Sequence, residues 1–99
     1  MKYDFSKPLT EEQMEVVRWT QENGDDVVKA GEHFDMDPTT IFRWTIQDYE
    51  ETRQPLMKQG FEEMTDELLH QINSIYEKEV NLRKIWEDYE RDLKEKQQA

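Results

Sequence analysis

The chain has 99 residues, of which 24 are Asp or Glu and 13 are Lys or Arg, so its formal net charge is −11. A chain of this length forms one small domain with an extension, and its net charge repels phosphate backbones and anionic membrane surfaces. It contains no cysteine, which excludes disulfides, thiol catalysis and thiolate metal sites.

The N-terminal segment, MKYDFSKPLT, lacks the apolar core of a secretion signal. No later stretch approaches the roughly 18 apolar residues that a membrane span needs. We therefore expect a cytoplasmic protein that does not interact with membranes. Eleven aromatic residues at helical intervals favour ordered helices over a disordered chain.

Glycine and proline divide the chain into four expected helices and no strand, so the predicted fold class is all-α. The first helix follows Thr10, whose hydroxyl caps it while Gln13 reaches back, and it runs to about Asn23. The second begins after Asp25. The residues expected to face inward from these two helices are Met14, Val17 and Trp19 or the stem of Arg18, then Val27, Ala30, Gly31 and Phe34.

The third helix is predicted to begin with Asp37 as its cap and Pro38 at its first position, where the missing N–H costs nothing. It directs Ile41, Trp44 and either Thr45 or Asp48 inward. Between the second and third helices, Asp35 stands at a position suited to a left-handed turn residue. Together the three helices form a compact N-terminal head.

The stretch from Asp25 to Glu51 resembles the helix-turn-helix of the insertion-sequence transposase type, the small first-reading-frame protein with an N-terminal helix-turn-helix and a zipper. The residues that carry the resemblance are Gly31, Phe34, Met36, the cap Asp37 and the run Thr39-Thr40-Ile41-Phe42-Arg43-Trp44. The layout also resembles that of phage small terminase subunits. Both resemblances imply a DNA-binding protein of a phage or mobile element.

In such a fold the third helix enters the major groove, and its outward residues are then the binding candidates. These are Thr39, Thr40, Arg43 and Gln47. Residues 1–55 hold six basic and thirteen acidic side chains, a net charge of 6 − 13 = −7. This acidity favours the alternative function, an inhibitor or DNA mimic that binds a basic host protein, either a nucleic-acid-binding or a defence protein.

The C-terminal half carries a seven-residue repeat of apolar side chains, which is typical of a coiled coil. The predicted seam consists of Phe61, Leu68, Ile72, Ile75, Glu79, Leu82, Trp86, Tyr89 and Leu93. The domains are thus expected to be a helix-turn-helix domain over residues 1–54 and an oligomerisation helix over residues 55–99.

A helix from about Pro55 to Lys96 extends roughly 60 Å, too far for the small head to cover, so we expect self-association as a dimer or higher oligomer. The alternative is that the helix folds back on the head. Glu79 interrupts the seam, and Arg83 is placed to pair with it along the same helix.

The sequence shows no catalytic or cofactor motif. Glu67 and His70 have the spacing of a di-iron ligand pair but fall on the outward side of the repeat, and Asp25-Asp26 is most simply a solvated carboxylate pair. We therefore expect no enzyme, no metal site and no cofactor.

Overall fold

The computed structural model describes residues 7–98, and within this range the chain is built from helices without strands, as predicted. Residues 1–6 and 99 of the two expected domains lie outside the described part. The long axis measures 53 Å, against 28 and 25 Å for the other two. The helices are α1 (Glu11–Glu22), α2 (Val27–Phe34), α3 (Pro38–Glu62) and α4 (Asp66–Gln98).

The first three predicted helix starts are confirmed, and each has a side chain that satisfies free backbone N–H groups. The predicted start of the fourth helix near Pro55 is wrong, because α4 begins at Asp66. Thr10 and Gln13 form a reciprocal capping box, with distances of 3.2 Å from the Gln13 amide to the Thr10 hydroxyl and 2.9 Å for the return bond. Asp26 caps α2, where Oδ1 accepts from the Lys29 amide at 3.1 Å. Asp37 caps α3, with Pro38 following it.

Helix α3 does not end near Pro55, so the predicted helix break at residue 55 is wrong. Pro55 lies inside a continuous helix that reaches Glu62. A proline costs a helix one internal hydrogen bond and adds a steric conflict, and contacts with α4 hold α3 on both sides of it. Arg53 pairs with Glu79 before the proline, and Gly60 lies against Leu68 after it.

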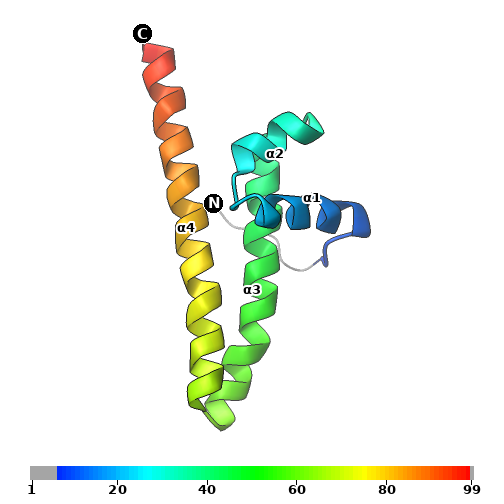
Figure 1. Ribbon diagram of the computed structural model, residues 1–99, viewed down its shortest axis with the longest axis vertical. Helices are drawn as coiled ribbons and strands as arrows, with labels where there is room; N and C mark the ends of the chain where they lie inside the picture. The colour runs from blue at the N-terminus through cyan, green and yellow to red at the C-terminus, as the bar shows by residue number, and fades with distance from the viewer. Residues whose placement is uncertain (1–6, 99) are drawn as a thin grey trace.

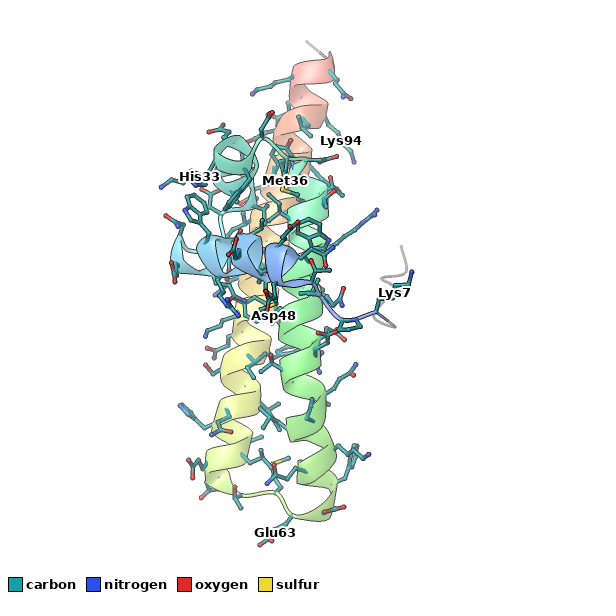
Figure 2. All side chains as sticks on the ribbon, turned by 90° about the vertical axis from the view of Figure 1, so that its right-hand side faces the viewer. Lys7, His33, Met36, Asp48, Glu63 and Lys94 are labelled. Atoms are coloured by element: carbon teal, nitrogen blue, oxygen red, sulfur yellow. The ribbon has the colours of Figure 1, made fainter. Side chains whose placement is uncertain are left out.

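Helix α4 folds back along α3 to make a long antiparallel hairpin, while α1 crosses α3 and α2 lies near the start of α3 (Figure 1). The open end carries the three-helix head, and Figure 2 places Glu63 at the closed end and Lys94 near the level of Met36. The fold-back alternative therefore describes the single chain. The head does not have to cover α4 because α3 itself is 25 residues long.

The predicted seam is occupied within the chain for most of its length. Leu82 is fully buried, Leu68 is nearly so, and Trp86 stacks on Phe42 with ring centroids 5.1 Å apart. Phe61 is 88% exposed, because it lies on α3 and turns away from α4. Of the remaining seam residues, Glu79 is buried, Ile72, Ile75 and Tyr89 are half-buried, and Leu93 is exposed.

Glu79 is only 3% exposed, and its partner is Arg53 of α3 instead of the predicted Arg83. The Arg53 guanidinium donates through Nε to Oε2 at 3.0 Å and through Nη2 to Oε1 at 3.4 Å. It also pairs with Glu50 at 3.2 Å. The expectation of Arg83 came from spacing along one helix, whereas burial against α3 selects a partner across the hairpin.

We predict that Arg53→Met destabilises the fold by about 3 kcal/mol, because it leaves the Glu79 carboxylate buried without a partner. Urea denaturation followed by helical circular dichroism measures this loss. The double variant Arg53→Met/Glu79→Leu removes both charges and should recover most of it. Equal losses in the single and double variants would show that the two side chains are not coupled.

Candidate functional site

The turn between α2 and α3 is short and sterically fixed. Asp35 adopts the left-handed conformation expected for it, with φ 53° and ψ 51°. The Met36 amide donates to the Gly31 carbonyl at 2.9 Å. A Cβ on Gly31 would lie 2.8 Å from the Met36 oxygen and 3.0 Å from Pro38 Cγ, so this position requires glycine to let the turn close. The turn therefore sets the angle at which α3 leaves α2.

The inner face of α3 forms the core of the head. Ile41 and Ile46 are fully buried, and they belong to one apolar cluster with Val27 and Ala30 of α2. Thr45 is also buried, and its hydroxyl donates to the Ile41 carbonyl at 2.8 Å. Because this side of α3 packs in the core of the head, the opposite side faces outward.

Three of the four predicted binding residues lie together on the N-terminal half of α3. Arg43 is exposed, and Thr39 and Thr40 are half-buried. The Thr39 amide donates to the Asp37 cap at 2.9 Å, which fixes the first turn of the helix. These three side chains form what we call the α3 face.

Gln47 does not belong to the α3 face, so its prediction as an outward binding residue is wrong. Gln47 is 7% exposed, and its Nε2 donates to the Lys7 carbonyl at 2.7 Å and to Glu51 Oε1 at 2.9 Å. Its partner Lys7 lies 40 residues away along the chain, which helical spacing alone does not reveal. The Gln47 amide holds residue 7 against α3.

Acidic side chains border the α3 face. Asp37 precedes it, and Glu50 and Glu51 follow it along α3. No group of His, Asp or Glu residues within 7–98 is arranged to hold a metal ion. None of the helices in that range is long and apolar enough to cross a membrane.

Asp25 and Tyr49 form a buried polar contact that helical spacing does not predict. The Tyr49 hydroxyl lies 2.9 Å from both carboxylate oxygens of Asp25, which is 9% exposed and has a φ of 60°. The expectation that Asp25 is solvated is wrong, because its backbone ends the α1–α2 turn facing α3. At the rim, Gln21 Nε2 donates to Asp48 Oδ2 at 2.7 Å.

Burial raises the pKa of Asp25 above its ordinary value of 3.8, although the hydrogen bond from Tyr49 and the charge of Lys78 act in the opposite direction. Burial and the nearby Asp25 carboxylate likewise raise the pKa of Tyr49. The pair connects the α1–α2 turn to α3. It therefore positions the head helices relative to the α3 face.

The raised pKa of Asp25 gives a pH dependence of known sign. The folded chain binds this proton more tightly than the unfolded chain, so stability falls as pH rises from about 3.8 through the raised pKa. Asp25→Asn keeps an oxygen acceptor for Tyr49 and cannot ionise. We predict that the free energy of unfolding of the variant, minus that of the wild type, increases with pH across this window and then stays constant.

Tyr49→Phe is the matched variant, and it should change the pH dependence of stability in the opposite direction to Asp25→Asn. It removes the hydrogen bond that lowers the pKa of Asp25, so the loss of stability with rising pH should be steeper than in the wild type. Urea midpoints at a series of pH values measure both variants. Parallel pH profiles for all three proteins would contradict a buried, titrating Asp25.

Neither a known protein family, nor a curated protein, nor a solved structure matches the chain. Functional inference therefore rests on the geometry and charge of its own residues.

Proposed function

We propose that the chain is a non-enzymatic, cytoplasmic helix-turn-helix protein that binds DNA through the α3 face and acts as an oligomer. The observation that carries this proposal is that Thr39, Thr40 and Arg43 share the outward side of α3 while the turn at Asp35 fixes that helix. The major groove of B-DNA admits an α-helix. The resemblance to the insertion-sequence transposase first-reading-frame family and to phage small terminase subunits supports a role as a regulator or as a recombination or packaging accessory of a phage or mobile element.

The chemistry of the α3 face suits a small contact. The guanidinium of Arg43 can donate two hydrogen bonds to guanine or bind a phosphate, while threonine offers a hydroxyl for phosphate and a methyl group for thymine. Glu51 is exposed next along the helix and repels phosphates, whereas the charge of Glu50 is offset in part by its pair with Arg53. One head should therefore bind weakly, and joining two heads raises the apparent affinity without new contacts.

We predict that the wild type binds duplex DNA at about 50 mM salt and much more weakly at about 200 mM, because phosphate contacts release counterions. Arg43→Ala should weaken binding by about tenfold or more and make the salt dependence shallower by about one unit of slope. Fluorescence anisotropy with a pool of random duplexes measures both effects.

Lys58→Ala is the matched control, since it also removes one exposed positive charge, on the far part of α3. It should leave the affinity close to the wild-type value. Equal losses in Arg43→Ala and Lys58→Ala would indicate a general charge effect. Absence of binding by the wild type at the lower salt concentration would refute the proposal.

A second candidate function follows from the acidic border of the α3 face. Glu50 and Glu51 continue its outward side, and residues 1–55 carry a net charge of 6 − 13 = −7. Such a surface suits a basic protein, and the chain would then be an inhibitor or DNA mimic that occupies a nucleic-acid-binding or defence protein of the host.

This candidate predicts recovery of a basic partner when the immobilised chain is exposed to host lysate. Glu50→Lys/Glu51→Lys reverses the border and should abolish that recovery, whereas it should strengthen DNA binding if the first proposal holds. Retention of the same partner by the reversed variant would contradict an acidic docking surface.

A further inference from the structure

Helix α4 carries a second regular stripe that the hairpin does not use. Its members alternate in spacing by three and four residues, which places them on one side of a helix. All of them are exposed, with Leu69, Tyr76 and Val80 exposed by 45%, 57% and 47%. We call this set the outer stripe; it consists of Asp66, Leu69, Asn73, Tyr76, Val80 and Arg83.

The outer stripe is distinct from the surface that packs on α3. Each of its last five members follows a seam residue directly, as Leu69 follows Leu68 and Arg83 follows Leu82. One residue corresponds to a rotation of about 100° around the helix. The buried seam and the exposed stripe are thus two neighbouring sides of α4.

Exposed apolar side chains also occur on α3 and in the α3–α4 turn, at the closed end of the hairpin. Arg53 links the two helices on this side, since its Nη1 contacts Met57 Sδ at 2.8 Å and its guanidinium lies 6.0 Å from the centre of the Tyr76 ring. Phe61 and Met64 are 88% and 51% exposed nearby along the chain. Exposed apolar side chains of this size, gathered along one side of a helix, are typical of a docking site.

The charges at the two ends of the outer stripe identify the occupant. Asp66 stands at one end and Arg83 at the other, and the stripe residues between them are uncharged, three of the four being Leu, Tyr or Val. In an antiparallel pair of α4 helices related by a two-fold axis near residues 74 and 75, Asp66 faces Arg83 and Leu69 faces Val80. A parallel pair would instead place Asp66 against Asp66 and Arg83 against Arg83, which is unfavourable.

We propose that a second copy of the chain docks on the outer stripe in the antiparallel orientation. The stripe is self-complementary in charge and in apolar character, as a two-fold interface requires. The next position on the same side of α4 is Glu87. In this orientation Glu87 lies opposite residue 62, which precedes α4 in the second copy, so the pairing of charges stops at the first residue of that helix. This contact leaves the seam inside each chain intact.

The first test is the mass in solution, measured by analytical ultracentrifugation across a concentration series. The wild type should be a dimer, and Tyr76→Glu should dissociate at concentrations at least about tenfold higher, because the charge enters the centre of the contact. Asn81→Glu adds the same charge at an exposed position off the stripe and should remain dimeric. Unchanged helical circular dichroism establishes that both variants fold.

The second test determines the relative orientation of the two α4 helices. Because the sequence has no cysteine, a disulfide can form only between introduced cysteines. Leu69→Cys mixed with Val80→Cys should form a disulfide between the two variants under mild oxidation. Leu69→Cys alone should remain uncrosslinked. A disulfide between two Leu69→Cys chains, or a wild type that stays monomeric at about 100 µM, would overturn the proposal.

Reversal of the terminal charges tests complementarity separately. Asp66→Lys or Arg83→Glu alone should weaken the dimer, and the double variant should restore it, since Asp66 and Arg83 of opposite copies exchange roles. Failure of the double variant to recover would contradict this pairing. None of these measurements includes DNA, so their outcome is independent of the DNA titration.

Discussion

Packing of α4 along α3 is the constraint on which the rest of the molecule depends. Most of the stability of a helix in a protein comes from packing of its apolar face, and for α3 and α4 much of that face is buried only when the two helices lie together. Apolar surface is buried along the hairpin by Leu68, Leu82 and the stacked Phe42 and Trp86. The ion pair with Arg53 allows the Glu79 carboxylate to be buried in the same interface. Without α4, the half of α3 beyond the head would have no packing partner.

The same packing limits what the head can present. Phe42 sits between the threonines and Arg43 on α3, but its ring is 5% exposed and lies against Trp86. Gln47 is likewise turned from the outward surface by its bonds to Lys7 and Glu51. The outward surface of α3 is therefore narrow, bounded by α4 on one side and by acidic residues along the helix. A narrow, singly basic surface explains why the proposed function depends on joining two heads.

The sequence predicts well those features that local chemistry determines. The capping residues Thr10 and Asp37, the left-handed Asp35 and the inward Ile41 each follow from bonds or contacts within a few residues. The errors concern contacts between distant segments. Gln47 meets residue 7, Tyr49 meets Asp25 and Arg53 meets Glu79, so each pairing spans at least 24 residues and no helical period specifies it.

At Pro55 tertiary packing overrides local chemistry. The proline favours a helix end, but contacts with α4 on both sides of it keep α3 continuous. That override has a consequence for self-association. Had α3 ended there, more of the apolar repeat of α4 would have been exposed. Because α3 continues and covers that repeat, the surface of α4 that remains exposed is the outer stripe, whose last five members each follow a seam residue. Because α3 continues through Pro55, most of the seam is covered within the chain, whereas the outer stripe stays exposed.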